Sequence, residues 1–124
     1  MNNVELCNRI LPMTKKSEIH ELDKQGNIIG RQSIQQDNLD KKTGYMSDLF
    51  VDEAHRKKGI GARLMQAAEN MAKSLGLIKT KIEVDSENPA ISMYLGRGYK
   101  EVGRKRAKNG KTYIIFEKDL ETDT

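Results

Sequence analysis

The sequence predicts an α+β fold, in which a mixed, largely antiparallel central sheet contains one β-α-β crossover and a short second helix. Segments with the two-residue alternation of strands surround an amphipathic helical segment at residues 61–75. The C-terminal segments 99–106 and 112–118 are joined through Asn109-Gly110, a dipeptide typical of tight hairpins. Hairpins make neighbouring strands antiparallel, whereas a connecting helix makes them parallel, so we expect both kinds of pairing.

The first three strands are expected to form a meander. Residues 17–23 and 28–36 are strand-like and flank a loop at 23–27 that contains Gly and Asn. After a polar break at 37–44, residues 45–51 form a third strand. The end of this strand is apolar on both alternating faces, which is typical of a strand covered on two sides.

The helix at 61–75 has two distinct faces. Apolar side chains recur every three or four residues and are expected to face the sheet: Leu64, Met65, Ala68, Met71, Ala72 and Leu75. Polar side chains, among them Arg63, Glu69 and Lys73, fall on the opposite face. Gly76 is expected to end the helix.

Two further elements precede the C-terminal hairpin. Residues 78–84 alternate as a strand. Asn88-Pro89 is then expected to open a short helix that ends at Gly96 or Gly98. The predicted order is therefore three strands, a helix, a strand, a helix and two strands.

Length and composition exclude several classes of protein. With 124 residues, of which 36% are hydrophobic and 32% charged, the chain has the size and mixture of one globular domain. It has no run near the roughly 18 apolar residues of a membrane helix and no secretion-signal pattern, so we expect a cytoplasmic protein without a membrane partner. Cys7 is the only cysteine and there are two histidines, so no metal site is expected.

Positive charge is concentrated in one segment. Residues 100–111 carry six basic side chains and one acidic side chain, whereas the whole chain has a net charge of +4. The segment is either a solvated edge hairpin or a contact for an acidic partner. Aromatic residues make up only 5% and Trp is absent, so few side chains can stack on bases, which argues against a nucleic-acid partner.

The segment from Val51 to Ala62 joins the third strand to the helix through a basic, glycine-containing turn. Glycine lets the backbone approach a ligand, and the first N–H groups of a helix lack internal partners and lie at the positive end of its dipole. Arg56, Lys57 and Lys58 add positive charge. The segment therefore predicts an anion site, whereas its glycine spacing excludes both a nucleoside-triphosphate loop and a dinucleotide fingerprint.

The pattern V-x-x-x-x-R-x-x-G-x-G-A in this segment resembles the acyl-CoA pyrophosphate motif of the GNAT superfamily of N-acetyltransferases. The resemblance implies acetyl-CoA as the acyl donor. The residues implied to bind it are Phe50, Val51, Arg56, Lys57, Lys58, Gly59, Ile60, Gly61, Ala62 and Asn88. Family members splay two strands near Phe50 and Val51, where backbone N–H groups would also meet the oxyanion of the intermediate.

A second block supports the resemblance. Residues 82–99 are similar to the family's L-x-V-x-x-x-N strand and to the A-I-x-x-Y-x-x-x-G-[FY] helix that follows it. Family members commonly have one more residue between the positions of Asn88 and Tyr94, so the start of this helix is shorter or shifted here.

The resemblance implies transfer of an acetyl group to a primary amine by direct attack in a ternary complex. The amine can belong to a protein or peptide N-terminus, a lysine or a small molecule. It must lose a proton before nitrogen attacks the thioester, because a lysine has a pKa of about 10.4. The setting of Glu83 is similar to that of the base in ribosomal-protein N-terminal acetyltransferases, so Glu83 is the first choice, with Asp48 and Asp85 in reserve. Alternatively, Glu83 faces solvent or pairs with Lys81.

Tyr94 is the expected general acid. Coenzyme A leaves as a thiolate and needs a proton, and the resemblance places Tyr94 near the thioester sulfur. A phenol has an ordinary pKa of about 10 and is therefore protonated at neutral pH. Alternatively, Tyr94 is a core aromatic residue.

The resemblance covers residues 17–120, so residues 1–124 are expected to be a single domain with a reduced N-terminal segment at 1–16. Full members place a strand and two helices before the first hairpin, and these form much of the acceptor wall. The acceptor side is therefore expected to be open, which suits a peptide or protein, or to be completed by another subunit of a homodimer.

Two other functions stay open on the sequence. The reduced N-terminal segment suits a non-catalytic module that binds acyl-CoA, and product analysis on candidate amines separates this from an enzyme. The basic hairpin suits a nucleic-acid-binding protein, whose binding would depend steeply on salt and on Arg104, Lys105 and Arg106.

Overall fold

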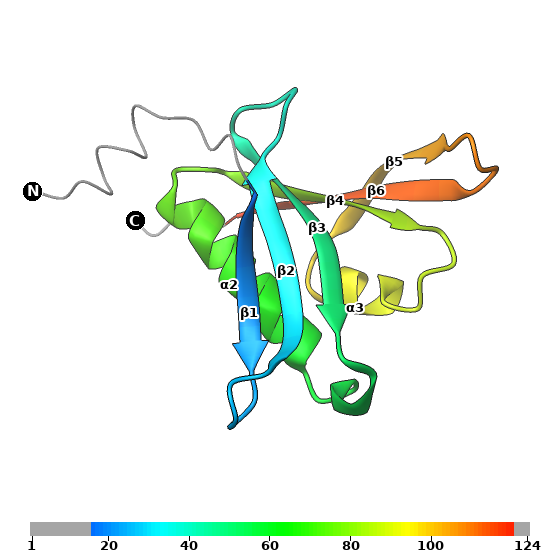
Figure 1. Ribbon diagram of the computed structural model, residues 1–124. Coiled ribbons are helices and arrows are strands. Elements are labelled where there is room, and N and C mark those ends of the chain that lie inside the picture. Colours follow the sequence, from blue (N-terminus) through cyan, green and yellow to red (C-terminus); the bar gives the residue numbers. More distant parts are fainter. Residues whose placement is uncertain (1–15, 121–124) are drawn as a thin grey trace, which may run out of the picture.

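The computed structural model describes residues 16–120, so the predicted N-terminal segment, apart from Lys16, and Cys7 lie outside the described residues. Within these described residues the fold consists of a six-stranded sheet and two α-helices (Figure 1). The elements are β1 (Ser17–Leu22), β2 (Ile28–Gln36), β3 (Thr43–Val51), the 3₁₀ turn η1 (Glu53–His55), α2 (Ile60–Ser74), β4 (Lys79–Asp85), α3 (Ile91–Gly96), β5 (Lys100–Arg106) and β6 (Thr112–Asp119). None of the helices between residues 16 and 120 is long and apolar enough to cross a membrane.

The sheet has the strand order β1-β2-β3-β4-β6-β5. Only β3 and β4 are parallel neighbours, and α2 connects them (Figure 1). All other neighbouring strands are antiparallel. The predicted α+β class, the mixed sheet and the β-α-β crossover are confirmed.

The strands β3 and β4 diverge along their length. Their pairing runs from Thr43 opposite Lys79 to Met46 opposite Ile82 and stops there, although β3 continues to Val51. Asp48, just beyond the last pair, has a φ of 59°, and the pairing of β3 with β2 shifts register at the same level. A non-glycine residue in this region marks a local distortion of the strand. The distortion accompanies an opening between the two strands.

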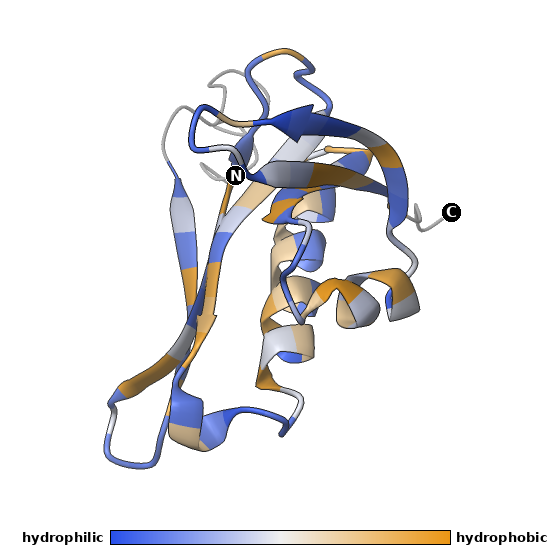
Figure 2. Cartoon of the chain, turned by 90° about the vertical axis from the view of Figure 1, so that its right-hand side faces the viewer, coloured by the Kyte–Doolittle hydropathy of each residue, from blue (hydrophilic) through white to orange (hydrophobic). Residues whose placement is uncertain are grey.

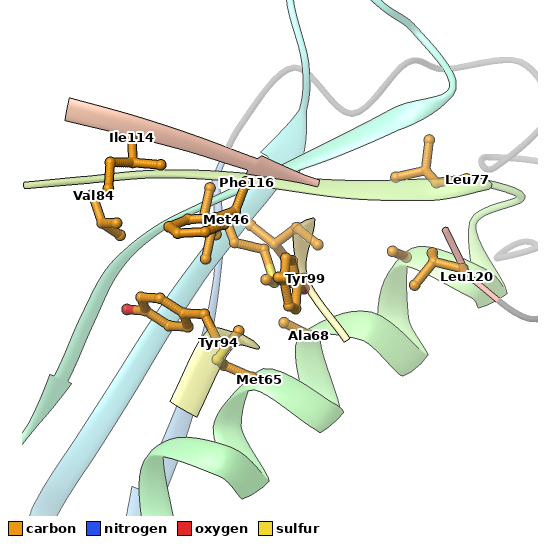
Figure 3. Packing of buried hydrophobic residues seen from close by; sticks show 13 residues of the cluster. Met46, Met65, Ala68, Leu77, Val84, Tyr94, Tyr99, Ile114, Phe116 and Leu120 are labelled. Carbon is orange, nitrogen blue, oxygen red and sulfur yellow. Dashed lines mark hydrogen bonds between the residues drawn. The ribbon is translucent and has the colours of Figure 1, made fainter. Parts of the chain in front are cut away.

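Both helices pack on the same face of the sheet. Met65, Ala68 and Ala72 of α2 form one buried cluster with Tyr94 of α3 and with sheet residues such as Phe116 (Figure 3). Figure 2 shows α2 and α3 together on one side of the curved sheet, with the strongly hydrophilic strand β5 at one end. The predicted inward face of α2 is therefore confirmed.

The opposite face of the sheet is covered by no helix of residues 16–120. Phe50 on β3 is consequently 41% exposed. The expectation that this strand is covered on two sides is therefore wrong. The apolar residues at its end instead line a cavity described below.

The position of Glu69 also departs from the helical pattern. The side chain is 2% exposed, although the pattern places it on the polar face of α2. Arg97 and Lys118 both donate to its Oε1 atom, at 2.9 and 3.1 Å, and the Tyr99 hydroxyl donates to Oε2 at 2.9 Å. These partners come from the segment after α3 and from β6, which cover this part of α2. A buried carboxylate is retained because it is fully paired.

The short helix α3 begins later than predicted. The Asn88 Oδ1 atom accepts a hydrogen bond from the Ala90 N–H group at 2.8 Å, so a turn precedes the helix, which starts at Ile91. The helix ends at Gly96, one of the two predicted ends. Gly98, with a φ of 95°, then lets the chain turn into β5.

Candidate functional site

The turn between β3 and α2 presents backbone N–H groups in an unusual conformation. Lys57 and Gly59 have positive φ values of 64° and 81°. No side chain caps α2, its first turn contains no acidic residue, and the first helical hydrogen bond runs from the Arg63 N–H group to the Gly59 carbonyl. Among residues 16–120, therefore, no group accepts a hydrogen bond from the N–H groups of the first helical turn, and the alternating backbone forms an anion-binding concavity.

The turn is held to the end of β3 by two side chains. The Arg56 Nε atom donates to the Val51 carbonyl at 2.9 Å. The ring of His55 contacts the Asp52 carboxylate, with 3.0 Å between Nδ1 and Oδ2. Arg56 therefore also fixes the shape of the turn, in addition to the charge that it contributes.

A cavity of about 580 Å³, here called the loop cavity, lies against this turn. It is lined by Leu49, Phe50, Val51, His55, Arg56, Lys57, Gly59, Ile60, Gly61, Ala62, Asn88, Pro89, Ala90, Met93 and Tyr94. It has the volume typical of a ligand pocket and combines an apolar strand end with a basic turn. It can therefore hold a molecule with an apolar arm and an anionic end.

The structure brings nine of the ten predicted cofactor residues to the loop cavity. The exception is Lys58, which lies between the two residues of positive φ and lines neither cavity described here. Sequence reasoning did not select five other lining residues: Leu49, His55, Pro89, Ala90 and Met93. All five lie inside or directly beside the two motifs, so their closeness to the motif residues in the sequence is the signal that could have identified them.

A second cavity, here called the splay cavity, opens where β3 and β4 diverge. It has a volume of about 190 Å³. It is lined by Gln32, Met46, Ser47, Asp48, Leu49, Ile82, Glu83, Val84, Asp85, Asn88 and Tyr94. Leu49, Asn88 and Tyr94 also line the loop cavity, so the two cavities meet at these residues.

Tyr94 stands at this junction with its hydroxyl available. Its ring packs against Tyr99 and Phe116, with centroids 6.4 and 6.3 Å away. The hydroxyl points away from Tyr99 and Met65 (Figure 3), and no group among residues 16–120 forms a hydrogen bond with it. Burial raises the pKa of this phenol above its ordinary value. Tyr94 is therefore a core aromatic residue that also lines both cavities, and its phenol is protonated at neutral pH.

The three candidate bases all line the splay cavity, and each is paired with a lysine. Lys16 lies 3.1 Å from Asp48, Lys105 lies 2.6 Å from Glu83, and Lys111 lies 3.2 Å from Asp85. Glu83 has the least exposed carboxylate of the three, at 18%. Its partner is Lys105, whereas Lys81, the partner considered from the sequence, pairs with Asp37.

The contacts of these ion pairs raise the pKa of one lysine and lower the pKa of one carboxylate. The Glu83 carboxylate raises the pKa of Lys105 by hydrogen bonding and by its charge. The pKa of Asp85 is lowered, first by the Glu87 N–H group and then by Lys111. A carboxylate with a lowered pKa is a weaker proton acceptor, so Asp85 is a weaker base than an ordinary aspartate.

Gln32 in the splay cavity had no signal in the sequence. It is 2% exposed, and its Nε2 atom donates to the Ser47 carbonyl at 2.7 Å. The sequence does not show on which face of the sheet a polar strand residue lies. It also does not show that Gln32 bonds to the distorted part of the neighbouring strand β3.

Within residues 16–120, no cluster of His, Cys, Asp and Glu side chains could hold a metal ion.

Comparisons with known proteins agree with this geometry. Residues 1–120 match the family model of the acetyltransferase (GNAT) domain. The match therefore extends over the N-terminal segment, which the resemblance of the sequence motifs does not cover. A search of the curated proteins finds no match.

Solved structures with the same fold include several acetyltransferases. An acetyltransferase from Bacillus cereus is 24% identical with a TM-score of 0.73, covering 96% of this chain and 87% of its own. The ribosomal-protein-S18-alanine N-acetyltransferase from Escherichia coli is 16% identical with a TM-score of 0.75, and the match covers 98% of this chain and 78% of that one. An aminoglycoside 6'-N-acetyltransferase complexed with coenzyme A is 18% identical with a TM-score of 0.76, with 90% and 76% covered.

Proposed function

Because the chain belongs to the GNAT acetyltransferase family, we propose that it transfers an acetyl group from acetyl-CoA to a primary amine in a ternary complex. The observation that carries this proposal is the meeting of the two cavities at Tyr94. One cavity suits an anionic donor with an apolar arm, and the other collects carboxylates that can hold and deprotonate an amine. A donor and an acceptor entering by these two routes meet at one point, which is the requirement for direct transfer.

The donor site is assigned residue by residue. The N–H groups of Ile60, Gly61 and Ala62 bind the pyrophosphate, assisted by the charge of Lys57 and the helix dipole. Phe50 and Val51 of β3 lie along the apolar arm. Acetyl-CoA supplies the acetyl group as an activated thioester.

Acid and base act from opposite sides of the junction. Glu83 accepts a proton from the acceptor ammonium, directly or through water, so that nitrogen can attack. Backbone N–H groups of β3 beyond Met46, where β4 no longer pairs, stabilise the oxyanion. Tyr94 then donates its proton to the leaving thiolate, since its raised pKa keeps the phenol protonated.

A peptide or protein is the acceptor class that the exposed sheet favours. Glu83 and Asp85 reach the splay cavity from the face of the sheet that no described helix covers. An open surface suits an extended chain better than a small metabolite, which needs an enclosed pocket. The acceptor amine is therefore presented by a larger molecule.

Binding of acetyl-CoA is tested by calorimetric titration, with adenosine and free pantetheine as controls. We expect 1:1 binding, weakened roughly a hundredfold by Gly61→Asp, because a carboxylate beside a pyrophosphate costs several kcal/mol. The fold tolerates a side chain there, since a Cβ at Gly61 would lie 3.6 Å from the Met93 sulfur, an ordinary contact. Gly61→Ala, which adds no charge, is the matched control and loses less affinity. Equal binding by Gly61→Asp and the unmodified protein would contradict the assigned donor site.

The base is tested with three charge-neutralising variants. We expect Glu83→Gln to lower kcat roughly a hundredfold or more with acetyl-CoA binding retained, which is the usual contribution of a general base. Asp48→Asn and Asp85→Asn are matched controls, because Asp85 is a weaker proton acceptor and Asp48 is half exposed. Steady-state rates on a panel of peptide amines provide the measurement. A larger loss in either Asp variant than in Glu83→Gln would reassign the base.

A further inference from the structure

Glu83, the proposed base, already holds an amine that belongs to the same chain. The Nζ atom of Lys105 lies 2.6 Å from Glu83 Oε1. The Glu83 side chain is 18% exposed and that of Lys105 is 55% exposed, so the amine covers the carboxylate from the solvent side. A lysine amine is chemically the same group as the proposed acceptor.

The sheet leaves a path for this lysine to reach the carboxylate. Glu83 on β4 pairs with Ile115 on β6, which pairs with Gly103 on β5, so the three residues form one row across the sheet. A Cβ at Gly103 would contact Ile115 at 3.7 Å, so a larger side chain would lie over Ile115. Because glycine has none, Lys105, two residues further along β5, extends across the row to Glu83.

Two features leave Lys105 free to move. Among the strands of the described part of the chain, β5 is at the edge and is bonded to β6 alone. The side chain of Lys105 is more than half exposed and has four rotatable carbon–carbon bonds, and within residues 16–120 the ion pair is the one contact that fixes its amine. The amine can therefore leave the carboxylate for the neighbouring cavity without a change in the sheet.

We propose that Lys105 is an acceptor for the protein's own acetyl transfer, so that the protein acetylates itself at this residue. This inference rests on the proposed function. The ion pair with Glu83 stabilises the Lys105 ammonium, so Lys105 first leaves the pair and then loses a proton to Glu83 through water. The free amine attacks the thioester carbon, and an N–C bond forms as the C–S bond breaks. The thiolate takes the proton of Tyr94, and Tyr94 regains a proton from the amide nitrogen. The products are acetyl-lysine, coenzyme A thiol and one proton, which passes from Glu83 to solvent.

Self-acetylation changes the state of the base. An acetylated lysine has no positive charge and cannot form an ion pair, so the contact with Glu83 is lost. The carboxylate is then available to an external amine. The modification therefore acts as a one-time release of the acceptor site.

Two other lysines approach the splay cavity but are less suited to react. Lys111 is paired with the Oδ2 atom of Asp85, and the other carboxylate oxygen, Oδ1, accepts the Glu87 N–H group. Lys16 is paired with Asp48, a half-exposed carboxylate. The least exposed carboxylate of the three holds Lys105. Modification is therefore expected at Lys105 ahead of the other two.

The test is incubation of the full chain with acetyl-CoA in the absence of any acceptor, followed by peptide mapping by mass spectrometry. We expect acetylation of Lys105 at a rate that is independent of protein concentration and at least tenfold above that of Lys108. Lys108 lies in the same hairpin and has no ion-pair partner within residues 16–120, so it reports uncatalysed modification. Lys105→Arg keeps a cation beside Glu83, and we expect it to remove the modification.

The closeness of the Lys105 amine to the acyl group is measured separately from turnover, with bromoacetyl-CoA as the probe. An amine close to the acyl group displaces bromide and becomes linked to coenzyme A, so a Lys105 adduct is expected even in Tyr94→Phe. Preferential reaction at Lys111 or Lys16 in both experiments would overturn the assignment. If external amines are acetylated while Lys105 stays unmodified and unlinked, only this inference fails. If acetyl-CoA does not bind at all, the proposed function fails with it.

Discussion

Tyr94→Phe is expected to lower kcat by roughly a hundredfold or more while leaving acetyl-CoA affinity and thermal stability unchanged. The substitution removes only the hydroxyl, which has no hydrogen-bond partner within residues 16–120. The ring contacts with Tyr99 and Phe116 are kept (Figure 3). Steady-state kinetics, calorimetric titration and a thermal melt on the same preparation separate the three effects.

The pH profile gives a second expected result for the same residue. Burial raises the pKa of Tyr94, so its donor form persists at pH values where an ordinary phenol would ionise. We therefore expect activity to rise with pH as the acceptor amine is deprotonated, and to show no decline near pH 10, the ordinary phenol value. A decline well below that value would indicate a different acid.

Tyr99→Phe is the matched control for Tyr94→Phe. The Tyr99 hydroxyl lies 2.7 Å from Thr80 Oγ1 and donates to Glu69 at 2.9 Å, in the interior. Removal of this hydroxyl leaves buried polar atoms unpaired, which costs about 1–3 kcal/mol of stability. Tyr99 lines neither cavity, so catalysis is not affected directly. The two tyrosines are thus expected to show opposite phenotypes. Equal turnover by Tyr94→Phe and the unmodified protein would contradict the acid role.

Glu69→Gln is expected to cause the largest loss of stability, about 3–5 kcal/mol in the free energy of unfolding. The Glu69 carboxylate is the shared partner of Arg97 and Lys118, whose side chains are only 17% and 25% exposed. Neutralising it leaves two cations close together and largely out of water, without an anion. Since a domain of this size has about 5–15 kcal/mol in total, the variant is expected to be partly unfolded at moderate temperature.

Chemical denaturation at neutral pH measures this loss, with Glu101→Gln as the control. Glu101 also pairs with an arginine, at 2.8 Å from Arg104, but that pair is exposed on β5. Exposed pairs are screened by water, so the control is expected to shift the midpoint little. Similar midpoints for the two variants would show that the buried cluster is not a major source of stability.

The sequence by itself determined the order of elements, the parallel pair and the buried face of α2. These follow from local causes, because alternation, helical periodicity and Asn109-Gly110 act between residues close in the chain. It also identified the glycine-containing turn before α2 as an anion site, because the free N–H groups at a helix start depend only on residues close in the chain. Nine of the ten residues assigned to the donor lie together at one cavity for this reason.

Only the tertiary structure decided which distant groups meet. The helical pattern placed Glu69 on the polar face because periodicity cannot record that Arg97 and Lys118 arrive from other elements to pair with it. The partner of Glu83 was undetermined for the same reason: Lys81 is close in sequence, whereas Lys105 is brought near by two strand pairings. Burial of charge and the pairing of ions depend on through-space distance. They are therefore fixed by the assembled sheet, and no local pattern specifies them.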